Sequence, residues 1–177
     1  MKQTKKISRR VFVRKSASAI TGITILPSYL ALGKADTLGN IPPSKRINLG
    51  CLGIGGRGKK VIPQLCSDGA AKPVAFCDVD FNRADKEVMH AFPGARKFAD
   101  FRVMFDQMGD DIDAVSIVTP DHVHFVQTIE AMRRGKHVYV EKPLTHSFRE
   151  AALLIEAEKR YGVVTQMGNQ GHTSPGA

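Results

Sequence analysis

The chain has 177 residues, which is enough for one ordinary domain with a sizeable hydrophobic core. Its formal net charge of +9 comes from the N-terminus, because residues 1–35 contain eight lysines and arginines and no acidic residue, whereas the rest carries only +1. This distribution excludes a charge-driven nucleic-acid-binding domain, and three irregularly spaced cysteines exclude a disulfide framework.

The first 35 residues have the layout of a bacterial export signal. A basic start leads to Ser-Arg-Arg-Val-Phe at positions 8–12 and then to a mildly apolar stretch at 17–32. A serine before the paired arginines and a phenylalanine after them resemble the twin-arginine signal, so we predict that residues 1–35 are a signal peptide for that export machinery. The apolar stretch is too short and too often interrupted for a stable membrane span. The alternative is an uncleaved, amphipathic or disordered N-terminus.

A folded domain is expected from residue 45 onward, after a linker at 36–44 that contains glycine and prolines. We expect strands at residues 47–52, 73–78, 95–98, 114–118, 137–140 and 163–167. We expect helices at residues 59–65, 82–92, 101–108, 123–134 and 148–161. The residues expected to cap helices are Asp80, Asp100, Asp121 and Ser147. This alternation builds a doubly wound parallel sheet, the α/β architecture of Rossmann-like domains, over residues 45–168.

The first expected strand runs directly into a G-x-G-x-x-G motif. Its residues are Gly53, Ile54, Gly55, Gly56, Arg57 and Gly58. Gly53 permits a tight turn, Gly55 lets the backbone approach a pyrophosphate, and Gly58 lets the next helix pack close to the strand. Amide groups at the start of that helix offer partial positive charge to phosphates. The motif therefore predicts a dinucleotide-binding site, with a purely structural glycine turn as the alternative.

Asp78 ends the second expected strand, twenty positions beyond Gly58. An acidic residue at this place accepts hydrogen bonds from the adenosine ribose hydroxyls and repels a 2′-phosphate, so we expect NAD rather than NADP as the cofactor. Arg57 and Arg83 lie nearby in the sequence and would weaken this preference. The alternative for Asp78 is a helix cap.

The strand at 114–118 is followed by Thr119 and Pro120, and ligands of parallel α/β sheets bind at such strand ends. Both residues are therefore candidates for the cofactor site. His124 also follows this strand, and packing at the helix start and lining the site are equally open for it. His122 and His124 are two positions apart and do not share a helix face, so we expect no metal site.

Glu141 and Lys142 follow the strand at 137–140 and are the remaining candidates. A lysine that points into a cleft at a strand end is desolvated. It could hold a substrate hydroxyl and the nicotinamide ribose, and it could ease proton loss when an alcohol becomes a carbonyl. The alternative for Lys142 is a surface lysine in a turn. Pro143 fixes the backbone after it.

Together these motifs resemble the Gfo/Idh/MocA oxidoreductases over about residues 46–172. The shared segments are the glycine loop at 53–58, Cys-Asp-Val-Asp at 77–80, Thr-Pro-Asp-His-Val-His at 119–124 and Gly-Lys-His-Val-Tyr-Val-Glu-Lys-Pro-Leu at 135–144. The resemblance implies a nicotinamide-binding N-terminal domain, substrates such as sugars, sugar acids and polyols, and a place for Lys142 at the reacting atoms.

The resemblance also implies a second α/β domain, which carries the acid/base, often a histidine in an Asp-x-x-x-His motif. No such motif follows residue 168. We therefore interpret residues 169–177 as the start of that domain, and we expect this fragment to bind the cofactor without catalysing turnover.

Three functions remain open. The first is an exported oxidoreductase that transfers a hydride between NAD and a sugar-like substrate, a homo-oligomer when full length. Since the twin-arginine route carries folded proteins and nicotinamide dinucleotides are scarce outside the cytoplasm, we expect the cofactor to be loaded before export to the periplasm. The second is a glycosidase or lyase that uses bound NAD transiently, although glycosidases that resemble this family vary at Glu-Lys-Pro. The third is a non-catalytic nucleotide-binding module.

Overall fold

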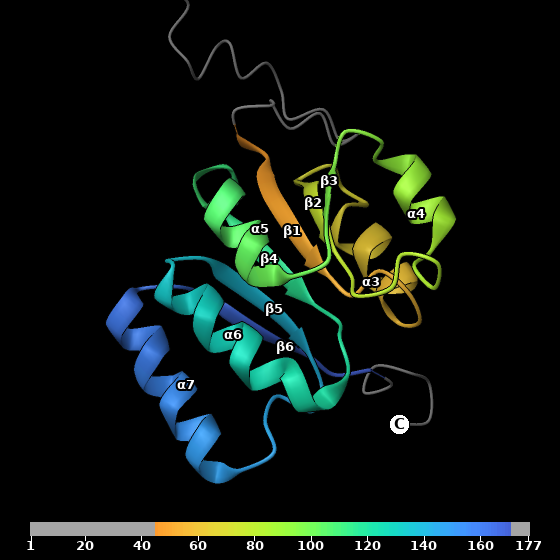
Figure 1. Ribbon diagram of the computed structural model, residues 1–177. Helices are drawn as coiled ribbons and strands as arrows, with labels where there is room; N and C mark the ends of the chain where they lie inside the picture. The colour runs from red at the N-terminus through yellow and green to blue at the C-terminus, as the bar shows by residue number, and fades with distance from the viewer. Residues whose placement is uncertain (1–44, 171–177) are drawn as a thin grey trace, which may run out of the picture. The chain divides into compact units, whose positions relative to one another are not determined.

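The structure is a computed structural model that describes residues 45–170 (Figure 1). The predicted signal peptide at 1–35, the linker at 36–44 and the C-terminal residues 171–177 lie outside the described residues. Within the described part, no helix combines the length and the apolar character needed to cross a membrane.

Residues 45–170 form a parallel sheet of six strands in the order β3-β2-β1-β4-β5-β6. The strands are β1 (Ile47–Leu52), β2 (Ala71–Cys77), β3 (Arg96–Phe98), β4 (Ala114–Ile117), β5 (His137–Glu141) and β6 (Thr165–Gly168). The chain order reverses between β1 and β4, so the sheet is doubly wound, as the sequence predicts. Because all neighbouring strands are parallel, their carboxyl ends meet at one edge of the sheet.

The α-helices that follow these strands cover both faces of the sheet (Figure 1). They are α3 (Gly58–Leu65), α4 (Lys86–Ala91), α5 (Phe101–Met108), α6 (His124–Arg133) and α7 (Phe148–Tyr161). Two 3-10 segments adjoin them, η3 (Gly109–Asp111) after α5 and η4 (Asp121–Val123) before α6. Helices α3 and α4 pack on one face, and α5, α6 and α7 pack on the other.

The hydrophobic core follows the two-residue alternation of side chains along the strands. On β1, Cys51 packs on the face of α3 with Ile62, whereas the next residue, Leu52, packs on the opposite face with Met104. Burial raises the pKa of the Cys51 and Cys77 thiols to about 12. Both cysteines are therefore small buried residues, as predicted.

Two of the predicted helix caps are present in the structure. The Asp100 carboxylate accepts a hydrogen bond of 2.9 Å from the Arg102 amide at the start of α5. The Ser147 hydroxyl accepts one from the Glu150 amide at the start of α7. These side chains satisfy amides that the first helical turn leaves unpaired, so they fix where each helix begins.

The predicted cap at Asp80 is wrong, and the helix expected at 82–92 starts later. The Asp80 carboxylate accepts from the Asn82 amide within a turn. Asp85 is the cap of α4, because its carboxylate accepts from the Val88 amide at 3.0 Å. Asp80 and Asp85 are both suitable caps by residue type, but Asp80 closes a turn and Asp85 caps the helix. Helix α4 therefore begins at Lys86.

The predicted cap at Asp121 is also wrong. The Val123 amide donates to the Pro120 carbonyl, which closes the tighter 3-10 turn of η4 over residues 121–123. Helix α6 then begins at His124 without any side-chain cap. The tight turn moves the start of the helix and carries His124 into the interior.

Candidate functional site

A cleft of about 790 Å³ lies at the carboxyl ends of the strands on both sides of the switch point between β1 and β4. Its walls come from the segments that follow β1, β2, β3 and β4. Predicted site residues that line it are Gly53, Gly55, Gly56, Arg57, Asp78, Thr119 and Pro120. The predicted site residues that do not line it are Ile54, Gly58, His124, Glu141 and Lys142.

The glycine loop depends on close backbone contacts at three of its glycines. Gly53 has a φ of +83°, and a Cβ there would collide with the Val118 carbonyl at the end of β4. A Cβ on Gly58 would collide with the Gly53 carbonyl, so the first turn of α3 packs directly on the turn after β1. Both roles agree with the sequence prediction. Gly55 also packs against the Arg83 carbonyl, a contact that the sequence did not predict.

The start of α3 has no side-chain cap, although the amides of Gly58 and Lys60 donate to the carbonyls of Gly55 and Arg57. Arg57 occupies the N-cap position and gives no side-chain hydrogen bond to the first-turn amides. Its Nε donates instead to Oε1 of Glu141, at 3.2 Å. Because uncapped helix starts carry partial positive charge, this end of the cleft suits a phosphate or pyrophosphate group.

The Asp78 carboxylate joins the end of β2 to the glycine loop. Its Oδ2 accepts from the Ile54 amide at 2.9 Å, and its Oδ1 accepts from the Asp80 amide at 3.0 Å. Neither donor belongs to a helix, so the alternative reading of Asp78 as a helix cap is wrong. Ile54 thus serves the site through its amide, while its side chain is fully buried in the core. Each carboxylate oxygen keeps a second lone pair for a ribose hydroxyl.

His124 joins the loop after β4 to the loop after β5. Its ring is 1% exposed, with Nε2 at 2.8 Å from the Thr119 carbonyl oxygen and Nδ1 at 2.7 Å from the Pro143 carbonyl oxygen. Carbonyl oxygens only accept, so both contacts are hydrogen bonds when each ring nitrogen carries a proton. Of the two possibilities left open by the sequence, the structure favours packing, because the ring bridges two loops and does not line the cleft.

Glu141 and Lys142 are neighbours in the sequence, but the first is buried and the second is exposed. Strand β5 continues to Glu141, whose side chain is buried and accepts from both Arg57 and Tyr139. Lys142 is exposed at the end of β5, and its peptide bond to Pro143 is cis. The expected desolvation of Lys142 is therefore absent within residues 45–170.

The structure adds residues that the sequence analysis missed. Val79 lines the cleft and is 91% exposed, and Gln127 lines it from α6, accepting a hydrogen bond of 2.6 Å from the Thr119 hydroxyl. Residues 99–102, after β3, also line it. The sequence held a signal for this last segment, because 95–98 was an expected strand and ligands bind at strand ends.

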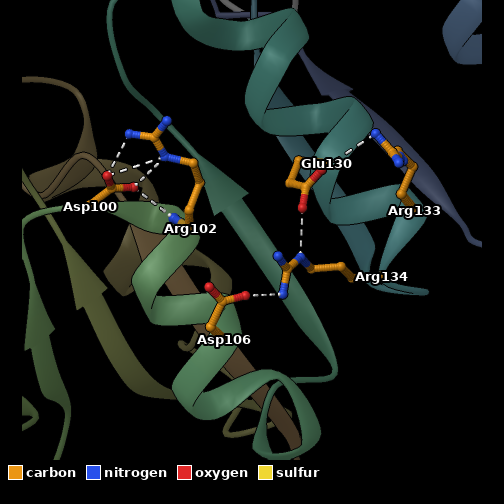
Figure 2. A network of polar contacts seen from close by, with 6 residues as sticks. All are labelled: Asp100, Arg102, Asp106, Glu130, Arg133 and Arg134. Atoms are coloured by element: carbon orange, nitrogen blue, oxygen red, sulfur yellow. Dashed lines mark hydrogen bonds and ion pairs between the residues drawn. The ribbon is translucent and has the colours of Figure 1, made fainter.

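An exposed ion pair lies at the β3 end of the cleft (Figure 2). Arg102 donates through Nη2 to Asp100 Oδ2 at 2.6 Å and through Nε to both carboxylate oxygens. These hydrogen bonds hold the pKa of Asp100 below its usual value, so its charge persists. Asp78 and Arg83 line the same cleft, which therefore combines acidic and basic side chains at this end.

The comparison with protein families finds one model that covers most of the described residues. Residues 47–169 match the model described as an oxidoreductase family with an NAD-binding Rossmann fold. This match spans the whole sheet, from β1 to β6.

Curated relatives are identical to the chain at about a quarter of the aligned residues. A glycosyl hydrolase family 109 protein of Shewanella pealeana is 25% identical over 173 residues, which cover 88% of this chain and 38% of the relative. An alpha-N-acetylgalactosaminidase of Shewanella oneidensis is 27% identical over 174 residues, which cover 87% of this chain and 37% of the relative. The chain thus spans less than two fifths of the length of these relatives.

Solved structures with this fold include a dehydrogenase and a 3-ketoreductase, each in complex with a nicotinamide dinucleotide. The WlbA dehydrogenase from Bordetella pertussis, in complex with NADH and UDP-GlcNAcA, has a TM-score of 0.64 and 28% identity, with coverage of 73% of this chain and 39% of that one. KijD10, a 3-ketoreductase from Actinomadura kijaniata in complex with TDP-benzene and NADP, has a TM-score of 0.61 and 26% identity, with coverage of 69% and 38%.

Proposed function

Because this chain belongs to the Gfo/Idh/MocA oxidoreductase family, we propose that it supplies the NAD-binding domain of an oxidoreductase acting on a sugar, sugar acid or polyol. One observation carries the proposal: a single cleft presents both the uncapped start of α3 and the Asp78 carboxylate. The first suits a pyrophosphate and the second suits the hydroxyls of an adenosine ribose. A bound nicotinamide ring would supply the hydride donor or acceptor.

NAD is the preferred cofactor in this proposal. The Asp78 carboxylate is fixed by two amides and would repel a 2′-phosphate on the ribose. Asp80 and Asp100 add two further negative charges to the same cleft, and Asp100 pairs with the nearby Arg102. Among the arginines at the β3 end of the cleft, only Arg83 has a side chain without a hydrogen bond or ion pair to a described side chain. The balance of charges at this end therefore favours NAD over NADP, which carries the extra phosphate.

Lys142 is the residue of this chain that we assign to the substrate hydroxyl. Its side chain is exposed at the carboxyl end of β5, and the cleft lies at the carboxyl ends of the neighbouring strands. Three N–H donors can orient a hydroxyl and stabilise its oxygen as the proton leaves. The group that takes the proton would come from outside residues 45–170.

A sugar-like substrate is supported by the structural relatives, of which one is a dehydrogenase in complex with UDP-GlcNAcA and another is a 3-ketoreductase. We propose that the protein is exported in folded form with NAD already bound, because residues 1–35 resemble a twin-arginine signal. Cell fractionation tests this step. The wild-type protein should reach the periplasm with a bound dinucleotide that shows nicotinamide fluorescence after reduction, and Arg9→Lys with Arg10→Lys should keep it in the cytoplasm.

The central test is a titration of the 177-residue chain with NADH and NADPH, followed by fluorescence of the bound nicotinamide. Saturable binding of NADH, with weaker binding of NADPH, is the expected result. Absence of saturable binding of either dinucleotide would contradict the proposal. Asp85→Ala is a matched control, because it removes a carboxylate that caps α4 and does not line the cleft.

A second candidate is an NAD-dependent glycosidase, which the names of the curated relatives favour. Such an enzyme oxidises its substrate, eliminates the leaving group, adds water to the unsaturated ketone and reduces the ketone again, so NAD is regenerated. Incubation of a longer protein that includes this domain with α-N-acetylgalactosaminides separates the two. Glycoside cleavage without net NADH formation favours the glycosidase, and net NADH formation from free sugars favours the oxidoreductase.

A further inference from the structure

The Glu141 side chain is the buried acid that the proposed function leaves without a defined role. It lies at the end of β5 and is 6% exposed. A buried carboxylate is costly unless it is paired and hydrogen-bonded. Oε1 accepts from the Arg57 Nε and from the Tyr139 hydroxyl, both at 3.2 Å, whereas Oε2 has no partner within residues 45–170.

The Arg57–Glu141 ion pair connects two parts of the site that are far apart in the chain. Arg57 belongs to the glycine loop after β1, Glu141 belongs to β5, and β4 lies between these strands. Within the described residues, only Nε of the guanidinium takes part in a hydrogen bond. Arg57 also lines the cleft. Its remaining N–H donors are therefore available to an anion beside the start of α3.

Tyr139 and Gly168 complete this arrangement. Burial, and then the charge of Glu141, raise the pKa of the Tyr139 hydroxyl above its usual value, so the hydroxyl keeps its proton and donates. Gly168 of β6 pairs with Glu141. A Cβ on Gly168 would collide with the Tyr139 hydroxyl and would lie 3.0 Å from Cδ of Glu141. The absence of a side chain at Gly168 therefore leaves the space that the tyrosine and the glutamate occupy.

From these contacts we propose that Tyr139 and Glu141 are positioning residues for Arg57, and that together they hold its guanidinium at the cleft for the cofactor's pyrophosphate. This inference rests on the proposed function, because it assumes a dinucleotide in the cleft. Glu141 then acts through Arg57, and Tyr139 acts through Glu141. Gly168 provides the room that both require.

The test measures two quantities: the affinity for NADH, and the NMR signal of the Arg57 Nε–H proton in the protein without cofactor. In the 177-residue chain, Tyr139→Phe should weaken NADH binding about 3- to 10-fold, as expected for loss of one hydrogen bond of ordinary net strength that acts on the ligand indirectly. In an Arg57→Ala background, Tyr139→Phe should have no further effect. NMR of the Arg57 Nε–H proton without cofactor should show a protected signal that Tyr139→Phe and Gly168→Ala weaken. Glu141→Gln should weaken it further.

The controls are Tyr161→Phe, on α7, and Gly94→Ala, where a Cβ meets open space. Equal losses of affinity from Tyr139→Phe with and without Arg57 would overturn the inference. A wild-type chain that binds no NADH would contradict the proposed function instead. In that case the Nε–H signal still decides whether Tyr139 and Glu141 hold Arg57, and an unchanged signal in Tyr139→Phe overturns the inference.

Discussion

The two halves of the sheet build their part of the cleft in different ways. In the half formed by β1, β2 and β3, backbone groups determine the geometry of the site. The Asp78 carboxylate accepts hydrogen bonds from an amide of the glycine loop and from an amide of the loop after β2. In the half formed by β4, β5 and β6, buried side chains connect separate loops, as His124 and Glu141 do. The first half is therefore expected to determine cofactor affinity, and the second is expected to determine loop geometry.

The largest expected effect comes from the first half. Asp78→Ala removes two hydrogen bonds to backbone amides and the proposed ribose contact, so NADH affinity should fall more than about 100-fold. Titration by nicotinamide fluorescence measures this loss. Asp85→Ala should reduce stability by about 1 kcal/mol, as for loss of a helix cap, and leave affinity unchanged. Comparable affinity losses in both variants would mean that Asp78 acts only through folding.

The next effect lies in the second half and concerns stability. His124→Phe removes the ring nitrogens that contact the buried carbonyls of Thr119 and Pro143, which should lower the free energy of unfolding by roughly 1–3 kcal/mol. Urea denaturation measures it. Hydrogen exchange should rise in the loops at 119–123 and 142–146 and stay unchanged in β2. His90→Phe, on α4, is the control, with an expected change below about 0.5 kcal/mol. Faster exchange in β2 as well would remove the distinction between the halves.

The smallest effect tests the charge balance at the β3 end of the cleft. Asp100→Asn keeps a capping side chain at the start of α5 but releases Arg102, so the ratio of NADPH to NADH affinity should rise about 3- to 10-fold. The matched control is Asp106→Asn, since Asp106 pairs with Arg134 between α5 and α6 and does not line the cleft (Figure 2). An equal rise in both variants would assign the effect to net charge and not to this site.

The sequence predicted the first half better than the second, for a physical reason. The glycine spacing and Asp78 act through backbone geometry within 24 residues, so the local pattern contains most of the information. Glu141 meets Arg57 across 84 residues, and only the strand order brings them together. The sequence identified both residues as candidates, but it did not indicate that they pair with each other.

Prediction of helix starts failed for a related reason. Asp80 and Asp121 are suitable caps by residue type, yet the turn at Asp80 and the 3-10 segment η4 use these positions for other hydrogen bonds. The choice between competing local arrangements depends on packing. That packing also buried His124, which the sequence left open between packing and lining the site.

The close fit of Gly168 against Tyr139 has an evolutionary consequence. A larger residue at 168 is compatible with the fold only if the side chain at 139 becomes smaller or moves, because a Cβ at 168 would collide with the tyrosine hydroxyl. The two positions should therefore covary among relatives. Lineages that lost glycine at 168 should also lack tyrosine at 139, and an alignment of relatives would reveal whether they changed together.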